Sequence, residues 1–264
     1  MNIKGAVAIV TGSGTGVGAA CIRQFAAKGA HVCVNYSRSR QEAEEVVAGC
    51  LAMGAEVELV EADVSDDAAC RRMVDIVVER WGRLDILVNN AAITKKSDAL
   101  DLETLTADDF EDVFAVNVIG VYQMVRAAVP AMRASGGGAI VNVSSNTAFT
   151  GGGTSIAYAA SKGALNTLTL AFARSQGPDI RVNAVCPGII DTRWMRNAVG
   201  AENYPALEKQ VSDSTPLGRV ATPDDVASAV VWLAEGADFV TGELLTIDGG
   251  LRRLLGPSRP RRQS

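Results

Sequence analysis

Short runs of apolar residues alternate with longer stretches of helical periodicity along most of the chain. Apolar runs of this length, without polar alternation, are typical of strands in a parallel sheet covered by helices on both faces. The strand-like runs lie at residues 7–10, 31–35, 56–60, 84–89, 139–143 and 180–185, and the helical stretches at residues 16–28, 41–53, 66–81, 107–133 and 158–175. This rhythm of βαβ units predicts a doubly wound α/β fold with a parallel sheet.

The same pattern predicts one domain over residues 1–250. In such a sheet, ligands bind beyond the carboxyl ends of the strands, so the chemistry is expected in strand-to-helix loops. The least regular internal stretch, residues 191–221, is expected to form a substrate-side lobe or lid before Thr222 and Pro223 begin another helix. Residues 251–264 contain five arginines and no acidic residue, and we expect a disordered tail or, alternatively, a segment that docks on a neighbouring subunit.

Composition and charge narrow the function classes. The formal net charge is -5, of which the arginine-rich tail contributes +5, so the rest of the chain is near -10 and shows no basic stripe for nucleic acid. The apolar runs are shorter than the roughly 20 residues that span a bilayer, and no secretory signal pattern is visible at the start. We therefore expect a cytoplasmic protein that acts on small molecules. Five scattered cysteines and the single histidine, His31, do not predict a metal site.

A glycine-rich loop follows the first predicted strand and opens the first predicted helix, in the segment TGSGTGVG at residues 11–18. Gly12 suits a tight turn, Gly16 allows the backbone to approach a pyrophosphate, and Gly18 allows close helix packing. The helix N-terminus adds N–H donors and positive potential. The loop thus predicts a Rossmann-type dinucleotide site, with contacts from Gly12, Ser13, Thr15, Gly16 and Val17; the alternative is a turn that only joins strand to helix.

The spacing TGxxxGxG in a chain of this length resembles the short-chain dehydrogenase/reductase family, and later motifs match it over residues 3–250. The pattern is most similar to 3-oxoacyl reductase-like members. Asp63 and Val64 resemble the family's adenine-contacting pair, and residues 89–92, NNAA, resemble its NNAG motif with Ala92 in place of glycine. The resemblance implies cofactor contacts at Asp63, Val64, Asn90 and Ala91. A helix-capping Asp63 and turn-forming asparagines are the alternatives.

The candidate catalytic group is the pair Tyr158 and Lys162, which lie four residues apart and therefore on one helix face. A tyrosine has a reference pKa of about 10, and a nearby positive charge is expected to lower it, so that Tyr158 acts as general acid or base. Ser145, at the end of a predicted strand, is expected to bind the substrate oxygen, with Ser144 as the neighbouring alternative. A tyrosine and a lysine on an exposed helix face would be the ordinary explanation without this serine.

Two further motifs complete the resemblance. Asn117, in the sequence NVIG, matches the family asparagine that holds a water linking Lys162 to solvent; a helix-bending asparagine bonded to backbone is the alternative. Residues 187–192, PGIIDT, resemble the segment that holds the nicotinamide carboxamide. The resemblance therefore implies cofactor contacts from Pro187, Gly188, Ile190 and Thr192, in addition to Tyr158 and Lys162.

The end of the second predicted strand bears on cofactor choice. Tyr36 occupies the position of the family's NAD-selecting aspartate, and no acidic residue lies in residues 35–40. Ser37, Arg38 and Arg40 are expected to surround a 2′-phosphate, which favours NADP(H) over NAD(H). Thr15 argues against this choice, because NADP-dependent relatives often carry a basic residue there. Alternatively, the two arginines pair with Glu42 or Glu44.

These observations predict an NADP(H)-dependent oxidoreductase that acts on a ketone or 3-oxo compound or the corresponding alcohol, as a homotetramer or homodimer. An NAD-dependent alcohol dehydrogenase of the same family and a catalytically inert dinucleotide sensor are the alternatives. The substrate pocket is expected to be apolar and lined by Phe149, Trp194, Met195 and Tyr204.

Overall fold

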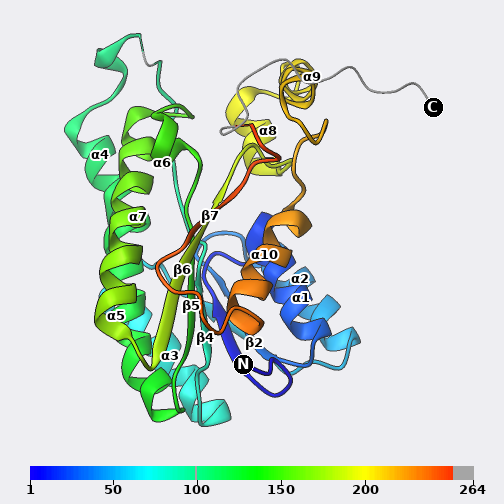
Figure 1. Ribbon diagram of the computed structural model, residues 1–264, viewed down its shortest axis with the longest axis vertical. Helices are drawn as coiled ribbons and strands as arrows, with labels where there is room; N and C mark the ends of the chain where they lie inside the picture. Colours follow the sequence, from blue (N-terminus) through cyan, green and yellow to red (C-terminus); the bar gives the residue numbers. More distant parts are fainter. Residues whose placement is uncertain (99, 252–264) are drawn as a thin grey trace.

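The computed structural model describes residues 1–98 and 100–251, and these form a seven-stranded parallel sheet in the order β3-β2-β1-β4-β5-β6-β7 (Figure 1). The strands are β1 Val7–Val10, β2 His31–Tyr36, β3 Val57–Glu61, β4 Ile86–Asn89, β5 Gly138–Val143, β6 Ile180–Pro187 and β7 Leu244–Ile247. The predicted doubly wound fold is confirmed. β7 was not among the predicted strands. The strand order reverses between β1 and β4, which is where the loops of such sheets separate to form a ligand crevice.

Helices cover both faces of the sheet. On one face lie α1 Gly16–Ala27, α2 Arg40–Ala52 and α10 Pro223–Glu235, and on the other lie α3 Asp67–Trp81, α4 Ala107–Phe114, α5 Val121–Ala134 and α7 Ile156–Gln176 (Figure 1). Shorter elements surround the carboxyl edge: η1 Leu102–Thr104, α6 Thr147–Thr150, α8 Arg193–Val199 and α9 Tyr204–Ser214.

The central strand β1 is apolar at every position because each face of the sheet has its own core. In β1, Ala8 and Val10 belong to the core cluster shared with α1, α2 and α10, whereas Val7 and Ile9 belong to the cluster shared with α3, α5 and α7. Successive side chains of a strand point to opposite faces. A strand with helices on both sides therefore lacks a regular alternation of apolar and polar positions, as the sequence pattern predicts.

The long predicted helix at residues 107–133 is interrupted. A π-helical turn, η2 Ala115–Gly120, separates α4 from α5. The side chain of Asn117 lies in this turn and binds the backbone of Ile93. By length and composition alone, Ala107–Ala134 would suffice to cross a membrane. Its buried residues, among them Val121, Met124 and Met132, belong to the core beneath the sheet, so it is a core helix of the fold.

Residues 191–221, the expected substrate-side lobe, contain two helices, α8 and α9, that the sequence pattern did not predict. Thr192 caps α8 by accepting a hydrogen bond from the backbone N–H of Met195 at 3.2 Å. Arg196 then binds Asp191 through two hydrogen bonds and lies 4.2 Å from the ring centre of the buried Tyr204. The start of α10 at Pro223, capped by Thr222, is confirmed. The expectations for the tail at residues 252–264 lie outside the described residues.

Candidate active site

A cavity of about 760 Å³ lies at the carboxyl ends of the strands. It brings together most of the residues that the sequence indicated, although they come from widely separated loops. Its lining includes Gly12, Thr15, Gly16, Val17, Ser37, Arg38, Asp63, Val64, Asn90, Ala91, Ser145, Tyr158, Lys162, Pro187, Gly188, Ile190 and Thr192. Among the predicted catalytic and cofactor-binding residues, Ser13, Tyr36, Arg40 and Asn117 do not line it.

The glycine loop has the geometry of a phosphate cradle. Gly12 and Gly16 have φ values of 60° and 56°, in the left-handed region that favours glycine. A Cβ on Gly12 would lie 2.9 Å from the Cα of Ala91, and one on Gly18 would lie 2.6 Å from the amide nitrogen of Asn90. The turn is therefore packed directly against the segment after β4. The N-terminus of α1 opens beside it and presents backbone N–H groups that fit a dinucleotide pyrophosphate.

Asn90 and Thr11 fasten this turn to the sheet. The Asn90 amide donates to the carbonyls of Thr11 at 2.9 Å and Gly12 at 3.0 Å. The Thr11 hydroxyl accepts from the backbone N–H groups of Asn90 and Ala91, both at 3.0 Å. Asn90 thus combines the turn-holding role with a place in the cavity wall. Asn89 instead points into the sheet, where its amide donates to Asn142.

Asn35 is a site residue that the sequence reasoning missed. Its side-chain oxygen accepts from the N–H of Gly12 at 2.9 Å, and its amide donates to the carbonyls of Ala62 at 3.0 Å and Val60 at 3.3 Å. Its backbone also exchanges hydrogen bonds with Ser13, which explains why Ser13 is buried behind the loop. A polar residue inside an otherwise apolar strand was the available signal.

The residues at the end of β2 that the sequence predicts to select the cofactor separate into two groups. Ser37 and Arg38 line the cavity, and Arg38 has no ion-pair partner among the described residues. Tyr36 is turned away, with its hydroxyl donating to Glu61 at 3.0 Å. Arg40 pairs with Glu44 at 2.9 Å, the alternative that its spacing allowed. The expected phosphate contact by Arg40 and the cavity position of Tyr36 are therefore not supported by the structure.

Asp63 and Val64, the predicted adenine contacts, both lie in the cavity wall. One carboxylate oxygen of Asp63 accepts from the N–H of Ser65 at 2.9 Å and from its hydroxyl at 2.7 Å. This turn fixes the carboxylate and leaves its other oxygen for a ligand. Val64 packs against the backbone of η2, because a Cβ on Gly120 would lie 2.8 Å from its Cγ2.

The predicted catalytic side chains converge in the cavity. Tyr158 forms a hydrogen bond with Ser145, and the Lys162 ammonium lies 5.5 Å from the centre of the Tyr158 ring. Lys162 is almost fully buried and donates to the carbonyl of Val143 at 2.9 Å. Ser144 is turned toward α7, where its hydroxyl donates to Asn166 at 2.7 Å. Ser145 is thus the serine that faces the tyrosine, as the sequence favoured.

The electrostatics differ from the sequence-based expectation. Burial raises the pKa of Tyr158 to about 12, although the hydrogen bond with Ser145 acts in the opposite direction. Burial also lowers the pKa of Lys162 to about 8. Desolvation disfavours the charged form of each group, and this effect exceeds the expected lowering of the tyrosine pKa by Lys162. Tyr158 is therefore a protonated phenol at neutral pH.

Asn117 does not reach the cavity. Its oxygen accepts from the N–H of Ile93, and its amide donates to the Ile93 carbonyl at 2.9 Å and the Ser161 hydroxyl at 3.0 Å. Both amide protons are used in these bonds, so the side chain fastens η2 to α7 and to the segment after β4. These bonds match the alternative of a helix-bending asparagine bonded to backbone, and the role of Asn117 in holding a water for Lys162 stays a prediction.

The segment after β6 closes the far side of the cavity. Gly188 donates to the carbonyl of Ile247 at 3.0 Å, and a Cβ there would lie 2.9 Å from that of Asp248. Ile190 pairs with Ala221 in an isolated parallel bridge. Thr192 lies close to the glycine loop, since its methyl carbon is 3.7 Å from the Cβ position of Gly16. The segment can therefore contact the nicotinamide end of a dinucleotide.

The expected apolar pocket residues are only half confirmed. Trp194 and Met195 line the cavity, whereas Phe149 and Tyr204 do not. Tyr204 is buried inside the lobe beneath Arg196.

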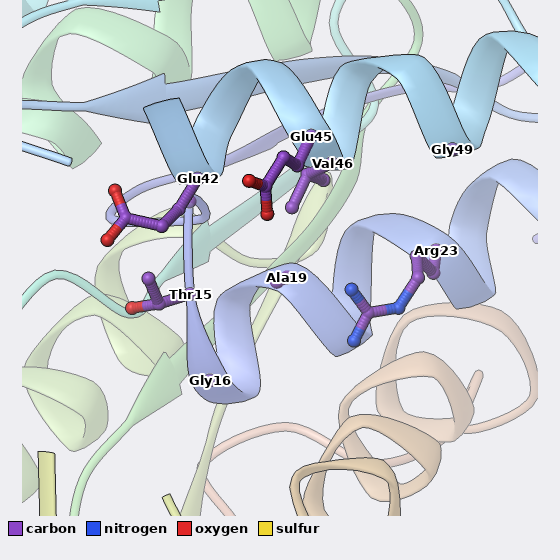
Figure 2. Close-up of a pocket in the computed structure, with 9 residues that line it drawn as sticks. Thr15, Gly16, Ala19, Arg23, Glu42, Glu45, Val46 and Gly49 are labelled. Carbon is purple, nitrogen blue, oxygen red and sulfur yellow. The ribbon is translucent and has the colours of Figure 1, made fainter. Parts of the chain in front are cut away.

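A second, smaller cleft of about 270 Å³ lies between α1 and α2, behind the glycine loop (Figure 2). In Figure 2, Glu42 and Glu45 from α2 face Thr15 and Arg23 from the α1 side.

Comparisons with known proteins agree with this site. A family model described as enoyl-(acyl carrier protein) reductase matches residues 12–252. The structure aligns with that of a variant of a Serratia marcescens short-chain dehydrogenase/reductase with a TM-score of 0.85 and 35% identity, over 95% of this chain and 99% of that chain. The chain belongs to the short-chain dehydrogenase/reductase family.

Two relatives illustrate the similarity within this family. Versicolorin reductase 1 of Dothistroma septosporum is 40% identical over 96% of this chain and 98% of its own length. A 3-oxoacyl-(acyl-carrier-protein) reductase of Thermotoga maritima is 35% identical over 95% of this chain and 99% of its own length. The protein is an NAD(P)-dependent oxidoreductase that acts on keto groups, and family membership implies a nicotinamide dinucleotide cofactor.

Gly12→Ala tests the cradle. A methyl group there would force the turn away from Ala91 and strain the backbone, so the Kd for the dinucleotide should rise at least about tenfold and the Tm should fall. Fluorescence titration and thermal unfolding measure the two effects. Gly49→Ala on α2, where a Cβ meets nothing within 4 Å, is the matched control and should leave the Kd unchanged. Wild-type affinity in Gly12→Ala would contradict the assignment.

Proposed function

We propose that the protein reduces a ketone or 3-oxo compound, with Tyr158 as the proton donor and NADPH as the preferred cofactor. The observation that supports this most is the placement of Tyr158 beside Ser145 and Lys162, in the same cavity as the glycine loop. The names of relatives support the substrate class, since both the versicolorin reductase and the 3-oxoacyl reductase are named as reductases. An inert dinucleotide sensor would have no need for these side chains.

The arrangement assigns a role to each side chain. The nicotinamide supplies a hydride to the carbonyl carbon when the cofactor is bound. The Ser145 and Tyr158 hydroxyls bind the carbonyl oxygen, where negative charge develops during reduction. Tyr158 then transfers its proton to this oxygen. Its pKa of about 12 keeps the phenol protonated at neutral pH, so that Tyr158 carries a proton to donate.

Lys162 has a supporting role in this mechanism. Its ammonium donates a hydrogen bond to the Val143 carbonyl. The ammonium nitrogen lies 5.5 Å from the centre of the Tyr158 ring. A positive charge at this position stabilises the phenolate left after proton transfer. Because its pKa is lowered to about 8, Lys162 is charged below that pH and loses its charge as the pH rises through it.

Tyr158→Phe removes the exchangeable proton and keeps the ring. We expect kcat for ketone reduction to fall by a factor on the order of 10²–10⁴, which is the usual contribution of general acid catalysis. The Kd for the cofactor and the Tm should change little. Ser144→Ala is a suitable control, since Ser144 faces Asn166 and not Tyr158. Wild-type turnover in Tyr158→Phe would disprove the mechanism.

The preference for NADPH rests on Arg38 and Ser37. Both line the cavity beyond the end of β2, and no carboxylate stands there to repel a 2′-phosphate. The guanidinium of Arg38 is free for bidentate contact with a phosphate, whereas that of Arg40 is engaged by Glu44.

Arg38→Ala should therefore reduce kcat/KM for NADPH about tenfold or more while changing that for NADH little. Arg40→Ala, two residues away and paired with Glu44, is the matched control and should leave the ratio nearly unchanged. Steady-state kinetics with both cofactors measure the ratio. A wild-type preference for NADH would refute the proposed selectivity, and an unchanged ratio in Arg38→Ala would refute the role of Arg38.

We also propose that the protein is a cytoplasmic homotetramer or homodimer. Tyr122 on α5 and Leu170 on α7 are 47% and 49% exposed, and the two helices pack side by side on one face (Figure 1). Apolar side chains gathered on a helical face are typical of subunit interfaces.

Leu170→Glu should shift the assembly to a smaller species, because a carboxylate would be buried without a partner at the interface. Light scattering measures the molar mass in solution. Leu51→Glu on α2 is the control, since Leu51 is similarly exposed but lies on the opposite face of the sheet. A monomeric wild type, or a Leu170→Glu variant of unchanged mass, would contradict the proposed interface.

A further inference from the structure

Trp194 is an exposed tryptophan held directly beside the proposed proton donor. Its ring centre lies 5.9 Å from that of Tyr158, with the two planes tilted by 43°. The side chain lines the cavity and is 41% exposed. The established family chemistry and the proposed roles of Ser145, Tyr158 and Lys162 make no use of it.

The helix that carries Trp194 is fixed on both sides of this residue. Arg193 forms an ion pair with Glu42 on α2 at 2.6 Å, across the glycine loop. Arg196 binds Asp191 through two hydrogen bonds of 2.9 Å. Thr192 caps the first turn of α8. Short helices have few contacts of their own to fix their orientation, and α8 has only seven residues. These contacts on both sides of Trp194 fix the helix and hold the indole at the cavity.

The position of Trp194 affects which substituents the carbonyl carbon of a bound ketone can carry. A carbonyl oxygen that accepts a hydrogen bond from Tyr158 places its neighbouring substituents beside the phenol ring. The indole is then in contact range of one of these substituents, and Met195, Val199 and Leu207 continue the apolar wall of the cavity. An aryl group conjugated to the carbonyl is coplanar with it, and offset or tilted ring pairs are the preferred aromatic contacts. A saturated ring of the same size has no π face and is thicker.

We propose that Trp194 selects aryl ketones, in which an aromatic ring is bonded directly to the carbonyl carbon that is reduced. This inference rests on the proposed function and names its substrate class. Trp194 acts as a specificity-determining residue through ring contact with the substrate. It takes no part in the proton transfer.

The test compares two ketones of the same carbon skeleton, acetophenone and cyclohexyl methyl ketone. For each, kcat/KM is measured with the preferred cofactor in the wild type, Trp194→Leu and Trp194→Phe. For each protein, kcat/KM for acetophenone is divided by kcat/KM for cyclohexyl methyl ketone. This aryl-to-saturated ratio in a variant is then divided by the ratio in the wild type, so that the difference in intrinsic reactivity between the two ketones cancels. Trp194→Leu should lower this ratio by about two- to tenfold, and Trp194→Phe should keep most of it.

Two controls keep the result interpretable. Phe149→Leu replaces an aromatic side chain of 39% exposure that does not line the cavity, and should leave the ratio unchanged. If Trp194→Leu does not fold, Trp194→Met keeps the apolar volume without a ring and serves the same comparison. An unchanged ratio in the leucine or methionine variant overturns the inference while the proposed function stands. A wild type that reduces neither ketone nor any other carbonyl compound overturns the proposed function itself.

Discussion

The amide side chains of Asn35 and Asn90 hold the glycine turn against the carboxyl ends of three strands, and the rest of the site is built on this attachment. Asn35 connects the Gly12 N–H to carbonyls at the end of β3, and Asn90 binds two carbonyls of the turn from the segment after β4. A buried amide without partners costs free energy, so each must find donors and acceptors in one geometry. The turn proposed to receive the pyrophosphate is thus held from both sides by hydrogen bonds that tolerate little displacement.

Much of the fold and the catalytic group could be predicted because they depend on local pattern. The apolar runs that became β1 to β6 are mostly buried, and the glycine loop, Tyr158 and Lys162 have fixed spacings along the chain. The cavity unites these residues as expected. β7 was missed, and its four residues are only partly buried at the edge of the sheet, where the apolar signal is weaker.

Other features depend on contacts that the sequence leaves open. Arg40 could face the cavity or pair with Glu44 four residues further on, and the structure shows the pair. Tyr204 is buried beneath Arg196, which is itself bound to Asp191. The pKa of Tyr158 depends on how completely the surrounding chain excludes water, which spacing does not reveal. Side-chain direction is equally hidden, as shown by Ser144 and Ser145, which are adjacent in sequence but face different residues of α7, Asn166 and Tyr158.

The π-helical turn between α4 and α5 changes the phase of the helix that crosses the sheet. An α-helix turns by about 100° per residue, and the wider turn at Ala115–Gly120 takes up one extra residue without adding a turn. Val113 before it and Met124 after it can therefore both face the core, with Asn117 buried between them. Loss of a single residue from this segment would rotate all of α5 by roughly a quarter turn. Chain length here is consequently as constrained as residue identity, because it sets which side of α5 meets the sheet.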